Sequence, residues 1–391
     1  MIYLDNASTT MPFKAVIEEV AQKLENYGSI GRGSGVNSDL CTEIYEGGRD
    51  KVKRFFGADD PKYTMFYTDG TTDGMNKLAS ALTCRHGVLV VSTRMEHHAN
   101  DLPWKERATV EYAEVDAAGH LVLQDFAKHL KNSRYENMQK YVTVTAASNV
   151  TGYINPVHEI ARIAHANNAK IIVDGAQIVA NRPFSMVGNT PEEDIDFFVF
   201  SAHKMYSPFG GGAVIGLTDV LNSHIPQFYG GGMVVTVDDD KATYTKAPEL
   251  YEAGSPNFPS VVGMLKSMEI LTEMGFDHIE QHQQKLFRQA LLGLSAIPNV
   301  TLYGDDEANR IGIIPFSVGG ITPEAAAERL AVEHNIALRY AAFCAHPYVR
   351  RLTRTNHKKG VVPEGLLRAS IGINNTSEDI NALISAVRHL V

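Results

Sequence analysis

The chain has 391 residues, of which 44% are apolar and 21% are charged, and its formal net charge at pH 7 is −9. This composition is ordinary for a folded globular protein, and the length suggests two or three domains. The acidic balance argues against a general nucleic-acid surface, which would be basic, and no apolar run approaches the ~20 residues of a membrane span.

The cysteines and the first residues bear on the compartment. Cys41, Cys84 and Cys344 make no disulfide framework. The opening residues, MIYLDNAST, lack the basic region and the apolar core of a signal peptide. We therefore expect a protein of a reducing compartment, the cytoplasm.

The first part of the chain contains a glycine-rich segment, Tyr27–Ser38. No strand precedes this segment, so we reject a dinucleotide-binding fingerprint. It is either a flexible connector or a loop that brings Arg32 to a site. The elements predicted around it are an extended segment over 1–12 and helices over Ala15–Asn26 and Cys41–Phe56.

Apolar runs of strand length alternate with amphipathic helical patterns between residues ~65 and ~215. This alternation predicts a mostly parallel sheet that helices cover on both faces. The expected strands are Thr64–Tyr67, Val88–Ser92, Val110–Val115, Tyr141–Ala146, Ile171–Asp174, Phe197–Phe200 and Ala213–Leu217.

The rest of the chain predicts a smaller α+β unit. Two segments, Phe228–Val235 and Glu252–Asn257, are expected to be irregular loops. A long helical pattern then runs from Ser260 toward Leu294, and Gly275 is expected to break it. The other expected elements are strands at Val300–Leu302, Ile311–Phe316 and Ile336–Leu338 and helices at Pro323–Val332 and Ser377–Leu390.

We divide the chain into two domains on this basis. The large α/β domain is expected to span 13–258. The small α+β domain is expected to combine 1–12 with 259–391, because the extended start and the C-terminal elements lie outside the alternating pattern.

Polar side chains follow the ends of four predicted strands: Thr71, His97, Asn149 and Asp174. The carboxyl ends of parallel strands meet at one edge of a sheet, so we expect these residues to converge. Thr71 also begins a predicted helix, where free backbone N–H groups favour an anion such as phosphate. The alternative for this position is plain helix capping.

Lys204 comes directly after the buried strand Phe197–Phe200, at the same expected edge. Partial burial disfavours the ammonium form of lysine, and a neutral amine forms a Schiff base with an aldehyde. A Schiff-base lysine together with a carboxylate for a pyridinium nitrogen, here Asp174, is the pairing that a pyridoxal phosphate enzyme needs. The alternative is a solvated lysine in a turn.

Two C-terminal residues have open interpretations. Cys344 follows a predicted strand, and Arg339 and His346 are close in sequence, so a nearby cation would favour the nucleophilic thiolate. The commoner case is a small buried cysteine. Arg368 is either a surface charge or a bidentate hydrogen-bond donor to a carboxylate.

The ordered motifs resemble the class V aminotransferase-like group of pyridoxal phosphate enzymes, of fold type I, and most closely the SufS/selenocysteine-lyase branch of the cysteine desulfurases. The resemblance covers nearly the whole chain. It implies a large domain with a mostly parallel seven-stranded sheet and a smaller α+β C-terminal domain. The motifs are YLDNAST, DGTTDGMN, EHHAN, SNVTG, VDGAQ, FSAHKMYSPFGGG, GGGM, EAGSPN, the Cys344 loop and RASIGINNTSEDI.

The resemblance implies how the cofactor is held. Lys204 corresponds to the Schiff-base lysine, Asp174 to the partner of the ring nitrogen and Gln177 to the donor to the ring hydroxyl oxygen. His97 corresponds to the ring stacked on the cofactor, with a role in proton transfer. The implied phosphate contacts are Thr71, Thr72, Ser201, His203 and, from the other subunit of a homodimer with a shared active site, Ser255.

The resemblance also implies the reaction. Asn149 and Arg368 correspond to the binders of the substrate carboxylate, with Arg339 as a third candidate, and Cys344 corresponds to the nucleophile that takes sulfur from L-cysteine as a persulfide and leaves alanine. A sulfur-acceptor protein is a possible partner, and no metal is expected.

The chain departs from that branch in three places. Ala341–Phe343 stand where the branch has GHH before the cysteine, Gly31–Gly33 replace HRG, and the histidine after VDGAQ is replaced around Asn181. Two alternatives therefore stay open. One is a C–S lyase, aminotransferase or epimerase that does not use Cys344, and the other is a non-catalytic sulfur carrier.

Overall fold

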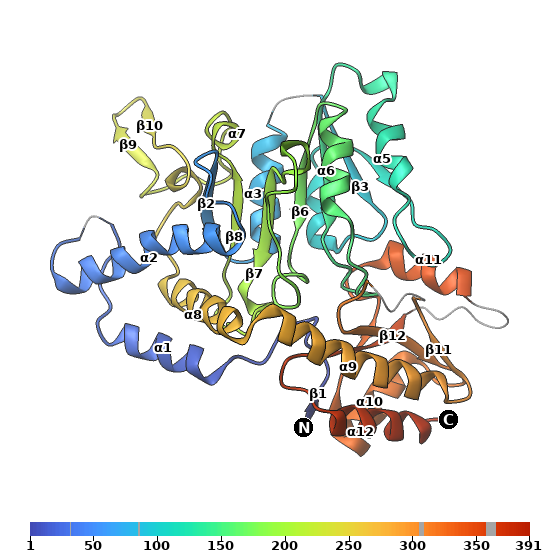
Figure 1. Cartoon of the computed structure of the whole chain (residues 1–391). Coiled ribbons are helices and arrows are strands. Elements are labelled where there is room, and N and C mark those ends of the chain that lie inside the picture. The colour runs from blue at the N-terminus through green and yellow to red at the C-terminus, as the bar shows by residue number, and fades with distance from the viewer. Residues whose placement is uncertain (32, 85–86, 305–308, 357–364) are drawn as a thin grey trace.

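The computed structural model describes residues 1–31, 33–84, 87–304, 309–356 and 365–391, so Arg32 lies outside the described residues. A large sheet with helices on both faces forms the upper part of the molecule in Figure 1. A smaller unit with α9, α10 and α12 lies below it, and both chain ends are there. No helix among the described residues has the length and apolar character to cross a membrane.

The large sheet has seven strands, as predicted, and six of them run in one direction. The exception is β8, which pairs antiparallel with both its neighbours. The carboxyl ends of the other six therefore share one edge. In spatial order the strands are β2 (Tyr63–Thr68), β8 (Gly212–Leu217), β7 (Phe197–Ser201), β6 (Ala169–Asp174), β5 (Gln139–Thr145), β3 (Val88–Thr93) and β4 (Thr109–Ala113).

Side-chain alternation along each strand divides the core into two layers. In β7, Phe198 and Phe200 pack with one set of helices, whereas Phe197 and Val199 pack with α3 on the opposite face. Burying each phenyl side chain contributes roughly 1.5–3 kcal/mol. The helices of the first face are α2 (Val36–Phe55), α5 (Leu123–Leu130), α6 (Val157–His165) and α8 (Phe258–Met274), and α3 spans Thr71–Leu82.

The smaller unit contains a four-stranded antiparallel sheet. A second core joins Leu4 to the C-terminal helices, and β1 (Ile2–Tyr3) pairs in parallel with β13 (Ile336–Ala337). The four strands are β11 (Val300–Leu302), β12 (Ile313–Val318), β15 (Leu366–Ser370) and β14 (Arg339–Ala341), and the helices are α9 (Phe276–Ser295), α10 (Pro323–His334), α11 (His346–Asn356) and α12 (Ser377–Arg388).

Two sequence predictions on the large unit need correction. The segment predicted as a loop over Phe228–Val235 ends in a strand, β9 (Val234–Val237), which pairs with β10 (Ala242–Tyr244) as a hairpin. The helix expected to begin at Cys41 begins at Val36, directly after Gly35, whose φ is 102°. The break at Gly275 is confirmed, because this glycine (φ 76°) ends α8 and precedes α9.

A buried ion pair fastens the loop before α8 to the sheet. Arg49 of α2 donates to both carboxylate oxygens of Glu252 at 2.7 Å, and Glu252 also accepts hydrogen bonds from the Tyr67 N–H (2.6 Å) and the Tyr45 hydroxyl (3.0 Å). The two charged side chains are each 9% exposed. Removing one charge would leave the other buried and uncompensated.

We therefore expect Arg49→Leu to lower the free energy of unfolding by roughly 3–5 kcal/mol. Denaturant unfolding curves would measure this loss. Arg54→Leu is the matched control, since Arg54 lies exposed on the same helix and its replacement should cost no more than ~0.5 kcal/mol. Equal losses in the two variants would contradict the role given to the ion pair.

Candidate active site

Lys204 lies at the shared edge of the large sheet, at the end of a short 3-10 helix (Ala202–Lys204) that follows β7. Protein surrounds the Lys204 side chain, although part of the residue remains accessible to solvent. This desolvation lowers the pKa of its amine to about 8. The negative charge of Asp174 opposes this effect and raises the pKa. Among the described residues, no hydrogen bond or ion pair engages the Lys204 amine.

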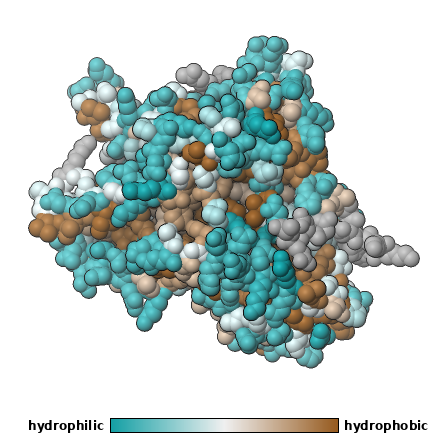
Figure 2. All heavy atoms as spheres, in the orientation of Figure 1, coloured by the Kyte–Doolittle hydropathy of each residue, from teal (hydrophilic) through white to brown (hydrophobic). Residues whose placement is uncertain are grey.

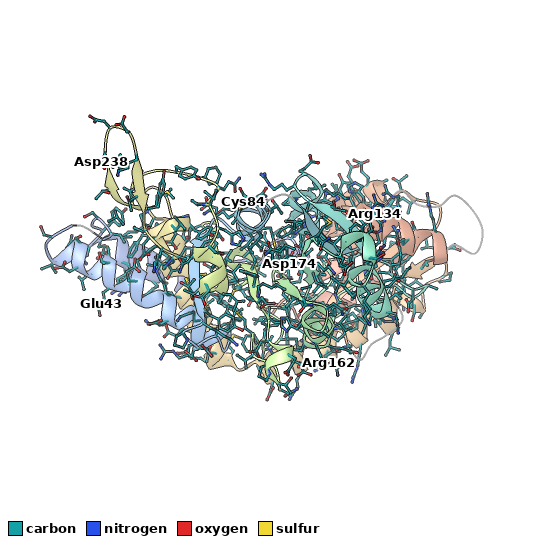
Figure 3. The ribbon with its side chains drawn as sticks, turned by 90° about the horizontal axis from the view of Figure 1, so that it is seen from above. Glu43, Cys84, Arg134, Arg162, Asp174 and Asp238 are labelled. Atoms are coloured by element: carbon teal, nitrogen blue, oxygen red, sulfur yellow. The ribbon has the colours of Figure 1, made fainter. Side chains whose placement is uncertain are left out.

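Asp174 ends the neighbouring strand β6 and is 3% exposed. Figure 3 shows it near the middle of the molecule, whereas the labelled Glu43 and Asp238 lie toward its edges. One carboxylate oxygen accepts a hydrogen bond from the Ala176 N–H at 2.9 Å. Burial raises the pKa of this carboxyl group, and the ammonium charge of Lys204 lowers it.

The lowered pKa of Lys204 predicts how its reactivity varies with pH. Compared with its ordinary value of 10.5, a pKa of about 8 gives about 300-fold more neutral amine at neutral pH. We expect apoprotein to attach pyridoxal phosphate at a rate that rises with pH and levels off above about 8. The visible band of the bound cofactor would measure this rate. A rate that kept rising toward the ordinary lysine pKa would contradict the buried environment.

Thr71 and Ser201 meet at the first turn of α3. The Ser201 hydroxyl accepts from the Thr71 N–H at 2.7 Å, and the two hydroxyl oxygens are 2.8 Å apart. Gly70, with a φ of 113°, directly precedes Thr71. A Cβ at this position would lie 3.1 Å from the Ser201 hydroxyl oxygen. This helix start therefore provides donors for an anion, and Thr72 is exposed beside it.

His203 contacts the N-terminal segment in this structure. Its Nδ1 lies 3.1 Å from the Thr9 hydroxyl, and burial followed by the charge of Lys204 lowers the pKa of its ring to about 4. Gln177 is buried and donates to the carbonyl of Ala7 at 2.7 Å. The phosphate and ring-hydroxyl contacts predicted for these two residues stay predictions.

His97 comes after β3 and caps a short 3-10 helix, His98–Asn100. Its Nδ1 accepts a hydrogen bond from the Ala99 N–H at 3.0 Å, so the proton of the neutral ring is on Nε2. Burial lowers the pKa of His97 to about 3, and the charges of Lys204 and Arg368 act in the same direction. His97 is thus a neutral ring near neutral pH, and its one N–H is on Nε2.

Arg368 enters the site from β15 of the smaller unit and is 2% exposed. It donates to the carbonyl of Asn149 at 2.8 Å, to the Ser8 hydroxyl at 2.6 Å and to Asp5 at 3.2 Å. Its Nε is buried and has no hydrogen-bond partner among the described residues. Arg339, half exposed, pairs with the other oxygen of Asp5 at 2.8 Å.

Asp5 and Ser8 were not predicted as site residues. They lie more than 300 residues from their arginine partner, and only the YLDNAST motif marked their segment in the sequence. The Asn149 amide, predicted to bind a substrate carboxylate, instead donates to the carbonyl of Phe343 at 2.7 Å.

Cys344 lies on a loop that is bound to the same edge of the sheet. The His98 N–H donates to the Cys344 carbonyl at 2.7 Å, and the Asn149 amide holds the preceding residue, Phe343. Both Phe343 (φ 51°) and Cys344 (φ 54°) have left-handed backbone conformations, which are uncommon for such side chains. Cys344 is exposed.

The Cys344 thiol lies close enough to Lys204 and Arg368 to interact with both charges. A negative charge on Cys344 acts to raise the pKa of both Lys204 and Arg368. The histidine that follows, His346, stacks on His98 with 4.9 Å between ring centroids, a pairing that the sequence did not reveal. The structure thus gathers Lys204, Asp174, His97, Asn149, Arg368 and Cys344 at one edge.

Ser255 is the predicted site residue that stays apart. It is exposed in the loop before α8, and no contact within the described part of the chain joins it to Lys204. That Ser255 reaches the site of a second subunit stays a prediction.

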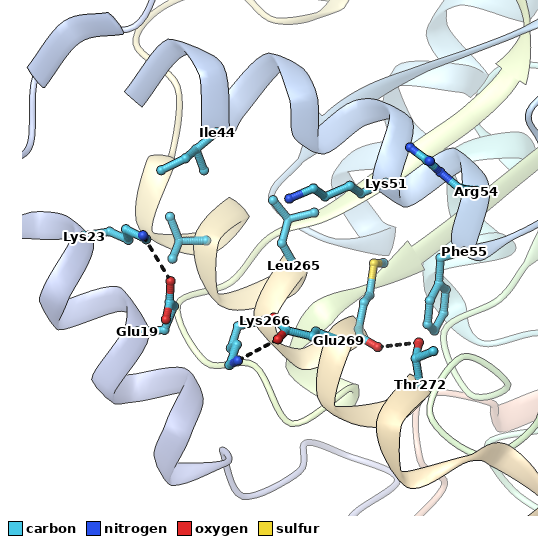
Figure 4. A pocket seen from close by; sticks show the side chains of 12 residues that line it. Glu19, Lys23, Ile44, Lys51, Arg54, Phe55, Leu265, Lys266, Glu269 and Thr272 are labelled. Atoms are coloured by element: carbon cyan, nitrogen blue, oxygen red, sulfur yellow. Dashed lines mark hydrogen bonds and ion pairs between the residues drawn. The ribbon is translucent and has the colours of Figure 1, made fainter. Parts of the chain in front are cut away.

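A separate groove of about 570 Å³ lies between α1 (Lys14–Leu24), α2 and α8. Figure 4 shows ion pairs along its walls, Lys23 with Glu19 and Lys266 with Glu269. None of the residues that line it is a predicted site residue, so we do not assign the reaction to it.

Comparison with known proteins decides the family. The model of the family described as Aminotransferase class-V matches residues 2–383. The chain belongs to this family. It is therefore an enzyme of the class V aminotransferase family, which agrees with the prediction from the motifs.

The curated relatives and solved structures that resemble this chain include several cysteine desulfurases. A probable cysteine desulfurase of Halalkalibacterium halodurans is 34% identical over 98% of this chain and 91% of its own length. A cysteine desulfurase of Haloferax volcanii is 32% identical over 99% of this chain and 88% of its own. The apo structure of a cysteine desulfurase from Thermococcus onnurineus NA1 has a TM-score of 0.89 and 28% identity, covering 100% of this chain and 94% of that one.

The residues at the sheet edge fit pyridoxal phosphate, the cofactor of this family. The unengaged amine of Lys204 suits its aldehyde, and the buried carboxylate of Asp174 suits a protonated ring nitrogen. The start of α3 suits the phosphate. The unpartnered Nε of Arg368 provides a further donor for a carboxylate ligand.

Proposed function

We propose that this enzyme is a pyridoxal phosphate-dependent cysteine desulfurase, which removes sulfur from L-cysteine as a persulfide on Cys344 and releases alanine. The observation that carries the proposal is the position of the Cys344 loop. Hydrogen bonds from His98 and Asn149 hold this loop at the edge that carries Lys204. The names of the curated and structural relatives support the same reaction.

Each residue at the edge has a task that its surroundings favour. Bound pyridoxal phosphate would supply an electron sink for a substrate carbanion. Lys204, with a pKa of about 8, would hold the cofactor and would accept the α-proton of the substrate. Asp174 would keep the ring nitrogen of the bound cofactor protonated, and the unpartnered Nε of Arg368 would bind the substrate carboxylate. The predicted help from Asn149 would come from the amide hydrogen that it does not donate to Phe343.

Cys344 carries out the sulfur transfer. Its thiolate attacks the substrate sulfur, so that an S–S bond forms while the C–S bond breaks, and the electron pair of the broken bond passes to the β-carbon. That carbon takes up a proton, and the neutral ring of His97, with its N–H on Nε2, would help to move protons at this edge. The products are a persulfide on Cys344 and alanine.

A second candidate is another class V reaction, such as a C–S lyase, aminotransferase or epimerase, that does not use Cys344. The packing of the loop favours it: Ala342 and Phe343, which replace residues of the branch motif, are only 5% and 7% exposed. A thiol on a loop packed in this way has less freedom to pass its sulfur to a distant acceptor.

We further propose a homodimer with a shared active site, in which Ser255 contacts the phosphate of the partner's cofactor. Apolar atoms gather at the surface over α1 and the start of α2 (Figure 2), where Ile17, Leu24, Val36 and Leu40 are exposed. An apolar surface of this kind is typical of an interaction site. The same proposal includes three further points. Selenocysteine is a second substrate, a sulfur-acceptor protein is a partner, and the enzyme is cytoplasmic.

The direct test is to incubate the purified holoenzyme with L-cysteine and to assay alanine and sulfide. We expect alanine in amounts that exceed the enzyme when a thiol reductant releases the persulfide sulfur as sulfide. A visible cofactor band without any alanine would reject the desulfurase and leave the second candidate. Other amino acids would then be screened as substrates.

A further inference from the structure

A buried carboxylate that has no part in the proposed reaction lies two strands along the sheet from Asp174, with β5 between them. Glu96 follows β3, is 2% exposed, and accepts a hydrogen bond from the Thr145 N–H at 3.1 Å. Thr145 is the direct neighbour of Asp174 across β5 and β6. Adjacent strands are ~4.8 Å apart, so the two carboxyl groups lie near enough for the charge of Asp174 to act on Glu96.

The hydrogen bonds around Glu96 require it to be an acceptor. The indole N–H of Trp104 can only donate, and it donates to the Asn100 side-chain oxygen at 3.1 Å. Asn100 must therefore point its NH₂ group at Glu96, 2.7 Å away. The remaining contact comes from the Thr93 hydroxyl at 2.6 Å, whose oxygen already accepts from the Met95 N–H.

Three donors thus converge on Glu96, which is the environment of an ionised carboxylate. Among the described residues, no cation forms an ion pair with it. Burial, with a smaller contribution from the negative charge of Asp174, raises the pKa of Glu96 to about 8 although its three donors lower it, so a cation beside the pair is needed to hold Glu96 ionised at neutral pH. Two neighbouring buried negative charges are unfavourable until a cation lies beside them.

We propose that Glu96 is a positioning residue that acts through Asp174, and that its negative charge keeps the ring nitrogen of bound pyridoxal phosphate protonated. This inference rests on the cofactor part of the proposed function. The charged group that acts on Glu96 is Asp174, and Asp174 in turn is acted on by the ammonium of Lys204. Lys204 and Arg368 also act on His97, whose ring is neutral. Glu96 and Asp174 are thus two buried carboxyl groups at the edge that carries Lys204 and Arg368.

The test is a pH titration of the visible spectrum of the holoenzyme, with and without the charge of Glu96. In Glu96→Gln we expect the midpoint of the cofactor titration to fall by about one pH unit, a tenfold loss of proton affinity, because a nearby negative charge is removed. Thr143→Val is the control, since it removes the hydroxyl that donates to Asn100 at 2.6 Å and keeps the charge. It should leave the midpoint unchanged, even if the protein becomes less stable.

A double variant covers the case in which Glu96→Gln does not fold. Glu96→Gln with Asn100→Asp reverses the bond between the two side chains, retains the contacts from Thr145, Thr93 and Trp104, and moves the charge away from Asp174. Its midpoint should lie below that of the wild type by less than one pH unit. A midpoint equal to wild type in both variants would reduce Glu96 to a structural role. A holoenzyme without any visible band would instead overturn the proposed function.

Discussion

Replacing Lys204 by alanine is expected to lower the rate of alanine formation from L-cysteine by at least ~10³-fold. The variant loses both the amine that holds the cofactor and the base that accepts the α-proton. Among the described lysines, Lys204 alone lowers the pKa of Asp174, so no other lysine lies beside this carboxylate to take over. Alanine assays on the two purified proteins would measure the effect.

Two further observations make this experiment specific. Borohydride should tether the cofactor to the peptide that contains Lys204 in the wild type and should tether none in the variant. Lys128→Ala is the matched control, because Lys128 is an exposed lysine on α5 whose ion pair with Asp125 is a surface contact. Full activity in Lys204→Ala, or cofactor tethered to another lysine, would contradict the assignment.

Replacing Cys344 by serine is expected to abolish desulfuration, with at least ~10³-fold less alanine formed, while the visible band of the cofactor stays. A serine hydroxyl has nearly the same size as the thiol, so the loop should keep its hydrogen bonds to His98 and Asn149. It cannot form a persulfide. The decisive comparison is between alanine formation and cofactor content in the same preparation.

Cys84→Ser is the control for Cys344→Ser, because Cys84 is also an exposed free cysteine. It should behave as the wild type. If Cys344→Ser kept its turnover, the enzyme would be a member of the class V family that does not use this thiol, and the packed residues before it, Ala342 and Phe343, would be the structural reason.

The sheet and its functional edge could be predicted because both follow from local pattern. Buried strands such as Phe197–Ser201 are almost entirely apolar, and parallel strands place their carboxyl ends together. The sequence pattern therefore predicts Lys204, Asp174, His97 and Thr71 at one edge. The family motifs added Cys344 and Arg368, which come from the other unit.

The elements that were missed have weaker local signals. The hairpin strand Val234–Val237 is mostly exposed, so burial does not impose an apolar pattern on it. The strand Arg339–Ala341 has three exposed residues, and the helix His346–Asn356 follows Cys344 with a strongly basic sequence. Exposed short strands leave little periodicity to detect. The helix does carry an apolar face of Tyr348, Val349 and Leu352 between its arginines, so its pattern was present in the sequence.

The polar contacts that complete the site depend on distant parts of the chain. Arg368 meets Asp5, and Glu96 meets Thr145, only because the sheets bring these segments together. The stacking of His98 on His346 likewise joins two loops that are far apart in sequence. Neither periodicity nor spacing encodes such pairs.

The measurement that tests the central claim most directly is mass spectrometry of the holoenzyme after one turnover. The enzyme would be mixed with an equal amount of L-cysteine without reductant, alkylated and digested. If Lys204 and Cys344 act at one site, the peptide that contains Cys344 should gain the mass of one sulfur atom, with an equal amount of alanine, and Lys204→Ala should show neither change. Alanine without added sulfur on Cys344, or sulfur on Cys41 or Cys84 instead, would contradict this claim.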